Sequence, residues 1–382
     1  MNRILLLALA AGLSVGLGYS ACGQTIRPKL AGAAPTNGFL TAVTQGFAQW
    51  DLNHDGLLSS NELTIAVGNP ATTNRAAAAL AALKQASRDP KAPLPLLTLS
   101  NICAVTAQRH PDLALLYRAD LRRILGATNR VLFAAGPPRL ESIHQGRLGN
   151  CFCLAPLGAL VHRDPQGVMD MFAPATNGQY RVRLGRQTVL VDPPTDGEIA
   201  LSSSNEHEGI WVNLYEKASG TVYNETLPPD RRADSALDAL AHGGSAGKML
   251  GVLTGHPFAR VSFKFAKDPA LPPASFTNRL ADLRHRLADA VQAHRLMTCG
   301  TITVTTPGLT PHHAYAVLNY NPATDAVELW NPHGQNFTPP AGPPGLTNGY
   351  PTKKGVFTLP LPEFVNQFSG MAFEQTAPPP AT

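Results

Sequence analysis

Residues 145–154 read QGRLGNCFCL, a glycine-bearing turn that leads into the apolar stretch 152–161. The apolar stretch is typical of a buried helix, and Asn150 is a residue type that favours the N-cap position. We therefore expect Cys151 at a helix N-terminus, where the helix dipole favours a thiolate. Gln145 stands six residues earlier and can donate an amide hydrogen to an oxyanion. The turn thus predicts a nucleophilic cysteine together with an oxyanion donor.

A cysteine nucleophile also needs a base and a residue that orients the base. His313 stands at the start of the segment 314–330, which predicts two strands that turn at 321–325; a further strand is expected at 301–305. Asn331 follows the second strand and so returns close to the start of the first. Its side-chain oxygen can accept a hydrogen bond from the imidazole and fix the tautomer. The pattern predicts a Cys-His-Asn triad.

These segments resemble the corresponding segments of the calpain family. Residues 145–154 are similar to the calpain active-site segment, 313–315 to the catalytic-histidine segment and 331–334 to the asparagine segment. Further stretches look like parts of the calpain core in the same order: 189–194, 210–218, 239–255 and 356–368. The resemblance covers most of the chain after residue 140.

The resemblance implies an α+β fold of the papain-like type, with two lobes and a cleft between them. The mainly helical lobe would carry Cys151, and the β-rich lobe would carry His313 and Asn331. By the same match, Gln145 is the oxyanion donor. Members of the family hydrolyse internal peptide bonds, often in a limited fashion and under calcium control. Proteins or peptides are therefore the implied substrates.

The sequence departs from the calpain pattern at four positions. Asn150 replaces an Asp, and Phe152 replaces a Trp but keeps an aromatic ring. Pro156 lies inside the expected cysteine helix, where it removes one backbone hydrogen bond. His333 replaces a Trp that shields the triad hydrogen bond in the family. We expect this last change to expose the bond and to introduce a competing hydrogen-bond partner.

Residues 51–62 read DLNHDGLLSSNE, which fits the twelve-residue calcium loop of an EF-hand. Gly56 stands at the sixth position, where the loop must turn sharply. The predicted calcium ligands are Asp51, Asn53, Asp55, the carbonyl of Leu57, Ser59 through a water, and Glu62 with both oxygens. Residues 37–66 thus resemble an EF-hand, with calcium as the cofactor. The alternative interpretation is an acidic turn between two helices.

EF-hands usually work in pairs, and helices expected at 72–87 and after residue 100 would frame a partner. Residues 97–99 would supply the short strand that pairs with Leu58. The intervening loop lacks acidic ligands at the right spacing, so we expect one bound calcium and a degenerate second loop. Since extracellular calcium is abundant, we expect the ion to stabilise this module rather than to switch activity.

The N-terminus is typical of an export signal. Arg3 precedes the apolar stretch 4–17, which is too short to span a bilayer comfortably, and small residues follow. Cleavage would release a soluble protein, whereas lipidation of Cys22 would anchor it as a lipoprotein. We expect an extracytoplasmic protein (secreted, periplasmic or lipoprotein-anchored) that contacts a membrane only if Cys22 carries a lipid.

The sequence divides into five expected segments. They are a signal peptide at 1–22, an EF-hand-like helical module at 37–125, a linker at 126–140, the cysteine peptidase domain at 141–370 and a disordered tail at 371–382.

Charge and cysteine content narrow the function classes. The net charge is +5, but lysines and arginines are spread along the chain, which disfavours nucleic-acid binding. Cys151 and Cys153 lack the spacing of a zinc site. We expect Cys103, Cys153 and Cys299 to be buried packing residues.

Three functions fit the motifs. The leading hypothesis is an exported calpain-like cysteine endopeptidase with calcium bound in the N-terminal loop. The alternative is a calcium-stabilised, catalytically inactive pseudopeptidase that acts as a binding protein. The third is acyl transfer of the transglutaminase type, although those enzymes generally orient the histidine with Asp rather than with a residue such as Asn331. The sequence does not indicate the oligomeric state.

Overall fold

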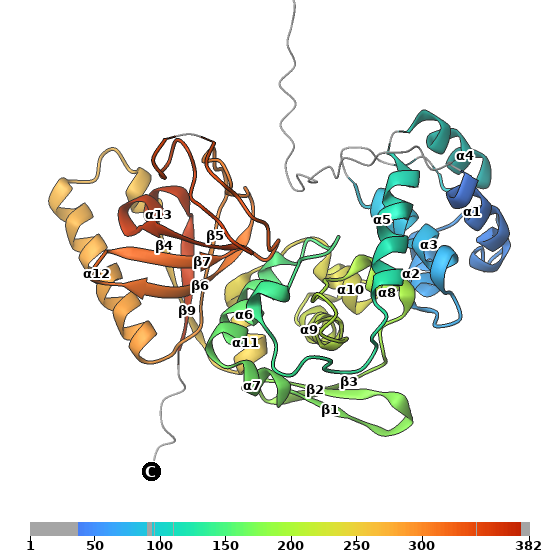
Figure 1. The fold of residues 1–382 in the computed structure, drawn as a ribbon, viewed down its shortest axis with the longest axis horizontal. Helices are drawn as coiled ribbons and strands as arrows, with labels where there is room; N and C mark the ends of the chain where they lie inside the picture. The colour runs from blue at the N-terminus through green and yellow to red at the C-terminus, as the bar shows by residue number, and fades with distance from the viewer. Residues whose placement is uncertain (1–36, 90–93, 95, 110, 341, 376–382) are drawn as a thin grey trace, which may run out of the picture.

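The computed structural model describes residues 37–375 except for 90–93, 95, 110 and 341. Three parts lie side by side in Figure 1: an N-terminal module (residues 37–126), a helical lobe (residues 140–254) and a β-rich lobe (residues 258–374). The expected signal peptide with Cys22 lies outside the described residues. No helix in the described part of the chain is long and apolar enough to span a bilayer.

The N-terminal module consists of helices only. They are α1 (Asn37–Trp50), α2 (Ser60–Gly68), α3 (Asn74–Ser87), α4 (Leu99–Gln108) and α5 (Leu113–Gly126). Ser59, Thr98 and Asp112 cap α2, α4 and α5, because each side chain accepts a hydrogen bond from a first-turn backbone N–H. The alanines of α3 are buried except for Ala76, which lets α1, α2 and α5 pack closely around the helix. The N-terminal region is therefore helical, as expected.

The helical lobe is built on α6 (Cys151–Arg163). Around it lie η1 (Leu140–Ser142), α7 (Pro165–Met169), α8 (Asp196–Leu201), α9 (Trp211–Glu225), η3 (Pro229–Arg231), α10 (Ala236–Leu240) and α11 (Ala246–Thr254). A small antiparallel sheet covers one end of the lobe, with its strands in the order β1 (Phe172–Pro174), β2 (Tyr180–Leu184) and β3 (Gln187–Val191). The short helix η2 (Thr176–Gly178) connects β1 to β2. The core contains most of α6 together with the fully buried Trp211 and Tyr215 of α9.

The β-rich lobe is a six-stranded antiparallel sheet in the order β4-β9-β5-β6-β7-β8. Its elements are β4 (Phe258–Ser262), η4 (Lys264–Lys267), α12 (Pro273–Gln292), β5 (Met297–Gly300), β6 (Ala314–Asn321), β7 (Ala326–Trp330), β8 (Val356–Pro360), α13 (Leu361–Gln367) and β9 (Gly370–Glu374). Strand β6 is buried on both faces. Tyr315 and Val317 pack into this lobe's core, whereas Ala314 and Ala316 face the helical lobe, where their small size lets α6 approach.

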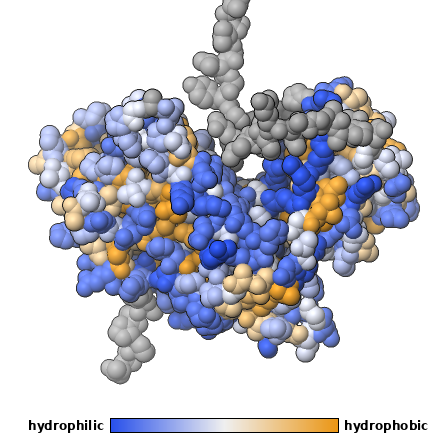
Figure 2. All heavy atoms as spheres, in the orientation of Figure 1, coloured by the Kyte–Doolittle hydropathy of each residue, from blue (hydrophilic) through white to orange (hydrophobic). Residues whose placement is uncertain are grey.

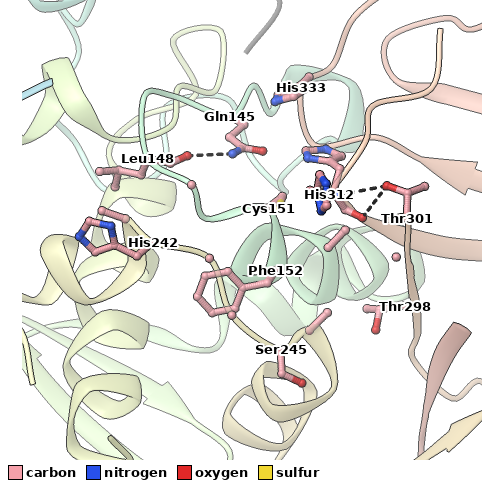
Figure 3. Close-up of a pocket in the computed structure, with 18 of the residues that line it drawn as sticks. Gln145, Leu148, Cys151, Phe152, His242, Ser245, Thr298, Thr301, His312 and His333 are labelled. Atoms are coloured by element: carbon pink, nitrogen blue, oxygen red, sulfur yellow. Dashed lines mark hydrogen bonds between the residues drawn. The ribbon is translucent and has the colours of Figure 1, made fainter. Parts of the chain in front are cut away.

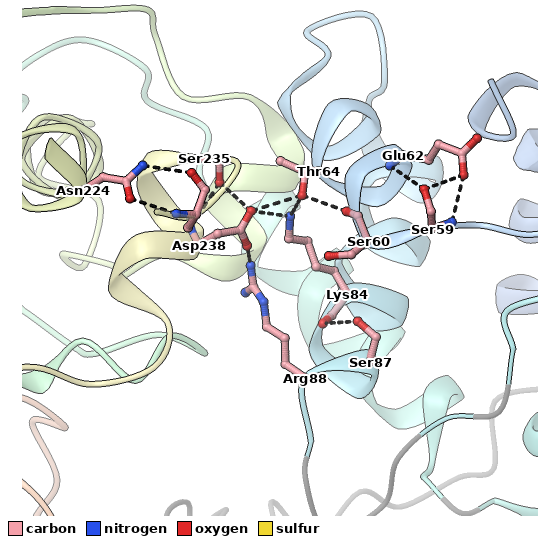
Figure 4. A network of polar contacts seen from close by, with 11 residues as sticks. Ser59, Ser60, Glu62, Thr64, Lys84, Ser87, Arg88, Asn224, Ser235 and Asp238 are labelled. Carbon is pink, nitrogen blue, oxygen red and sulfur yellow. Dashed lines mark hydrogen bonds and ion pairs between the residues drawn. The ribbon is translucent and has the colours of Figure 1, made fainter. Parts of the chain in front are cut away.

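The N-terminal module shares a hydrophobic core with the helical lobe. Leu148, Leu201 and Leu237 of the helical lobe are buried in the same cluster as α3. Asp238 adds a polar anchor, shown in Figure 4, because it binds Lys84 at 2.9 Å and also pairs with Arg88. The module is therefore docked on the helical lobe rather than tethered by a linker alone.

Three sequence expectations were wrong. No strand forms at 301–305, because the strand of this region, β5, ends at Gly300 and the chain turns away. The tail expected from residue 371 contains instead most of β9, which lies between β4 and β5, since its apolar side chains fill the sheet interior. Cys103 is exposed, because Ile102 and Val105 form the buried face of α4.

Candidate active site

Cys151 is the first residue of α6 and is partly buried. The carbonyl of Asn150 starts the helix by accepting the N–H groups of Cys153 at 2.9 Å and Leu154 at 3.1 Å. The expected side-chain cap is absent, because the Asn150 amide donates instead to the buried carboxyl of Glu216. The N-terminal end of α6 favours negative charge on the Cys151 sulfur.

Helix α6 continues through Pro156, so this residue does not end the cysteine helix. Two turns into the helix, Gly158 lies directly under the indole of Trp330, where a Cβ would come within 2.3 Å of the ring. Trp330 is the last residue of β7 and is completely buried. The glycine therefore sets how closely the cysteine helix approaches the strand that leads to Asn331.

His313 and Asn331 are joined by a hydrogen bond of 2.8 Å between Nε2 and Oδ1. Both side chains are buried. His313 immediately precedes β6, and Asn331 immediately follows β7, so the hairpin brings together residues that are far apart in sequence. Thr301 holds the His313 main chain, because the N–H of His313 donates to Thr301 Oγ1 at 3.1 Å and the His313 carbonyl accepts the Thr301 N–H at 2.9 Å.

The hydrogen bonds of Asn331 define the tautomer of His313. The main-chain N–H of His333 donates to Asn331 Oδ1 at 3.0 Å, which identifies that atom as an acceptor. His313 Nε2 must then carry a hydrogen, and Nδ1 of the neutral ring is left as the proton acceptor. This is the tautomer that a general base requires at this position.

The side chain of His333 covers the His313 ring. The two imidazoles stack with their centroids 4.3 Å apart and their planes at 27°. Only the backbone of His333 donates to Asn331, so the expected competition from its side chain is not observed in the described hydrogen bonds. Burial and then the neighbouring His333 lower the pKa of His313 to about 3, whereas the bond to Asn331 acts in the opposite direction. Burial likewise lowers the pKa of His333.

Gln145 lies on the opposite side of Cys151 from His312 and Thr301, as Figure 3 shows. Its main-chain N–H donates to the carbonyl of Pro332 at 2.8 Å, and its amide nitrogen donates to the carbonyl of Leu148 at 2.8 Å. The amide nitrogen has a second hydrogen that this bond does not use.

Cys151, His313 and Gln145 line one cleft with a volume of about 1090 Å³. The surface over the middle of the molecule is mainly hydrophilic in Figure 2. The structure thus brings three of the four predicted catalytic residues, Cys151, His313 and Gln145, to one cleft. The fourth, Asn331, is hydrogen-bonded to the imidazole of His313.

The sequence matches the family model of the calpain family cysteine proteases over residues 122–339. The chain belongs to this family. Its calpain-family domain is a cysteine protease domain, so its substrates are proteins or peptides. The match includes Gln145, Cys151, His313 and Asn331, and it does not extend to residues 37–66.

The other described cysteines are poor candidates for the nucleophile of this calpain-family domain. Cys153 and Cys299 are buried, and burial raises the pKa of each thiol. Cys103 is exposed on α4, in the N-terminal module. Cys151 and Cys299 both contribute to the cleft lining, but Cys299 is buried whereas Cys151 is only partly buried, so Cys151 is the better placed thiol.

The predicted calcium loop connects α1 to α2 and is closed by its own side chains. Glu62 accepts the main-chain N–H groups of Leu52 and Ser59, each at 2.8 Å, and Asp51 accepts the N–H of Gly56 at 2.9 Å. Gly56 has the positive φ of +80° that the sharp turn needs. The N–H of Leu58 donates to the carbonyl of Leu97 at 3.1 Å, but residues 97–99 do not form the expected short strand, since Leu99 begins α4.

The predicted calcium ligands are all oxygen donors, and several of them are engaged in hydrogen bonds within the loop. The oxygens of Asp51, Asn53, Asp55, Leu57, Ser59 and Glu62 form the hard donor set that calcium prefers. Their geometry is not that of a preassembled site: within the described chain, no three or more His, Cys, Asp or Glu side chains are grouped to hold a metal ion. The carboxylates are bonded to backbone N–H groups instead, and Glu62 also binds the Ser59 hydroxyl. The donor chemistry therefore fits calcium, while the carboxylates are held by hydrogen bonds within the loop.

Sequence reasoning missed the role of Glu216. This carboxyl is completely buried and accepts hydrogen bonds from Asn150 and from the main chain and hydroxyl of Ser203. Burial raises its pKa, while the bonds from Ser203 oppose the rise. An acidic residue between Tyr215 and Ala218 on the apolar side of α9 was the available signal.

Proposed function

We propose that this protein is an exported cysteine endopeptidase that hydrolyses internal peptide bonds through Cys151, His313, Asn331 and Gln145. The hydrogen bond of 2.8 Å between His313 and Asn331 carries the proposal, because it leaves Nδ1 of the imidazole as the proton acceptor. The stacking of His333 on His313 also supports the proposal, because the ring of His333 covers the hydrogen bond between His313 and Asn331. The family membership supports the same chemistry.

The proposed reaction proceeds through a thioester. His313 accepts the proton of Cys151, and the thiolate sulfur attacks the carbonyl carbon of the peptide bond. The carbonyl π electrons move to oxygen, which the second amide hydrogen of Gln145 stabilises. The C–N bond then breaks while His313 returns the proton to the leaving amine. In the second half, His313 takes a proton from water and the resulting hydroxide attacks the thioester carbonyl. The C–S bond then breaks, the carboxylic acid product leaves, and His313 returns the proton to the sulfur of Cys151.

The experiment compares hydrolysis of reduced, carboxymethylated casein by the wild type and by Cys151→Ala. Loss of the nucleophile should lower the rate by at least about 10³-fold. Cys103→Ala is the matched control, because its thiol is exposed but lies in the N-terminal module, and it should keep the wild-type rate. Cleavage that survives Cys151→Ala would refute the assignment.

The pseudopeptidase is distinguished by labelling. Iodoacetamide should modify Cys151 faster than Cys103, since Cys151 lies at a helix N-terminus and shares the cleft with His313. If Cys151 reacts no faster than Cys103 and casein is not cleaved, the protein acts as a binding protein on a protease scaffold.

We infer that calcium stabilises the N-terminal module through Asp51, Asn53, Asp55, Leu57, Ser59 and Glu62. The support is the donor set, the turn at Gly56 and the contact between Leu58 and Leu97. Calorimetry on the full chain should find one site, and calcium should raise the melting temperature of the wild type. Glu62→Gln should remove both effects, whereas Glu141→Gln, an exposed acid elsewhere, should keep them. Two comparable sites, or lost calcium-dependent cleavage with unchanged stability, would contradict the inference.

We also propose export of the chain, on the basis of residues 1–22. Mass spectrometry of the mature protein distinguishes the soluble, cleaved form from the lipid-anchored form. A soluble product would begin near Cys22, whereas a lipoprotein would carry the added mass of acyl chains on that residue. Retention of the uncut N-terminus would contradict both.

A further inference from the structure

The cleft that contains Cys151 does not end at the two lobes of the protease domain. Its wall continues past Arg147 and Gly149 onto the N-terminal module, where the end of α3 and the start of α5 line it. The residues concerned are Gln85, Arg88, Pro111, Asp112, Leu115 and Leu116. The volume of about 1090 Å³ exceeds the range of typical small-ligand sites. The space fits several residues of an extended polypeptide.

The position of this wall relative to Cys151 is fixed by packing. Leu148 lies three residues before Cys151, and its side chain is buried in the core of the N-terminal module. Its carbonyl accepts the amide of Gln145 on the cleft side. The buried pair of Lys84 and Asp238 adds a second attachment. A substrate that reaches the wall therefore meets a surface at a set distance from the reacting bond.

The chemistry of the wall favours an apolar group. Leu115 is 39% exposed, and Pro111 and Leu116 beside it are partly buried. Two charged neighbours are engaged: Arg88 pairs with Asp238, and Asp112 caps α5 by accepting the N–H of Leu115 at 2.9 Å. Asp89 and Arg147 also line the cleft and are exposed. An apolar side chain that packs on Leu115 and Leu116 covers carbon atoms and does not need to desolvate these charges.

We propose that Pro111, Leu115 and Leu116 form a remote subsite that binds an apolar side chain of a polypeptide substrate whose scissile bond lies at Cys151. The subsite rests on the proposed peptidase function. It makes the N-terminal module a determinant of specificity, and it makes longer substrates better than short ones that share the same bond. Substrate binding there is continuous with the cleft, which is why we assign a substrate rather than a separate partner.

Leu115→Gln tests the subsite with little risk to the fold. Leu115 is the third residue of α5, where Gln is favoured in a capping box. Leu125→Gln is the matched control, because Leu125 is 58% exposed in the last turn of the same helix and does not line the cleft. The substrates are two quenched peptides around one bond mapped in casein: one of about 6 residues and one of about 14, which extends to about 45 Å. For the long peptide, Leu115→Gln should lower kcat/KM by about 5- to 10-fold, with no change for the short peptide or for Leu125→Gln.

A binding measurement separates failure of the subsite from failure of the proposed function. Fluorescein-labelled carboxymethylated casein is titrated with Cys151→Ala, with and without Leu115→Gln. Weaker binding caused by Leu115→Gln supports the subsite even if the wild type cleaves nothing. Cleavage that depends on Cys151 but is unaffected by Leu115→Gln, together with unchanged or absent binding, overturns the subsite and leaves the peptidase standing.

Discussion

Replacing His333 tests whether the His313–Asn331 pair is catalytic and shielded. The two imidazoles are stacked at 4.3 Å, and burial lowers the pKa of His333, so the ring is neutral at neutral pH. Its contribution is then that of a flat cover. His333→Ala removes the cover and lets water reach the bond of 2.8 Å between His313 and Asn331, whereas His333→Phe keeps a ring in place.

The expected magnitude follows from two contributions. Stacking of the rings contributes about 0.5–1.5 kcal/mol, and the net strength of a shielded hydrogen bond is similar, about 0.5–1.5 kcal/mol. Loss of both is about 1–3 kcal/mol, a decrease in kcat/KM of roughly 5- to 150-fold for His333→Ala. We expect His333→Phe to stay within about 3-fold of the wild type, because it loses neither contribution completely.

The pH profile adds an independent readout. Two charged rings with centroids 4.3 Å apart would repel by about 4 kcal/mol at an effective dielectric constant near 20. That repulsion disfavours a charge on one ring while the other ring carries a proton. His333 is one cause of the lowered pKa of His313, so the acid limb of the profile should lie at higher pH for His333→Phe than for the wild type. An acid limb at the same pH in both proteins, or an unchanged rate in His333→Ala, would refute this reasoning.

Two further predictions concern Gln145 and Asp120. Gln145→Ala should lower kcat for peptide hydrolysis by about 10²- to 10³-fold while alkylation of Cys151 by iodoacetamide stays near the wild-type rate, because only hydrolysis develops an oxyanion; equal losses in both assays would contradict this. Burial raises the pKa of Asp120 to about 7, against the opposing charges of Arg147 and Arg123. The folded chain then holds a proton that the unfolded chain has released, so stability falls as pH rises from about 4 to about 7 and levels off above. The melting temperature of Asp120→Asn should fall less between about pH 5 and about pH 8 than that of the wild type, and equal falls would exclude Asp120 as the cause.

The candidate site could be predicted from sequence where local pattern sets geometry. The turn before Cys151 implied a helix start, and the hairpin with a turn at 321–325 implied that His313 and Asn331 return to each other; the structure contains both features. The role of His333 could not be predicted in the same way. Whether it competes for Asn331 or covers His313 depends on a side-chain rotamer set by tertiary packing.

Features that depend on contacts between distant segments were missed. In the sequence, the residues of β9 look like part of a proline-rich tail. They form a strand because they pair with β4 on one side and with β5 on the other. Asn150 is a residue type that favours the helix N-cap, but its side-chain amide donates a hydrogen bond to the buried Glu216 instead. The part of the cleft wall that comes from the N-terminal module could not be predicted from the sequence. Leu115 lines the cleft only because α5 packs beside the loop that contains Leu148.

The segment 145–150 is held by all three parts of the molecule. The N–H of Gln145 donates to Pro332 of the β-rich lobe, and the N–H of Arg147 donates to Leu201 of the helical lobe at 2.9 Å. Leu148 is packed into the N-terminal module. The loop that supplies the proposed oxyanion donor is thus held in part by its packing against the module. We therefore expect calcium bound at residues 51–62 to affect peptide hydrolysis through the stability of the module, in proportion to the fraction folded, and not by moving a residue of the triad.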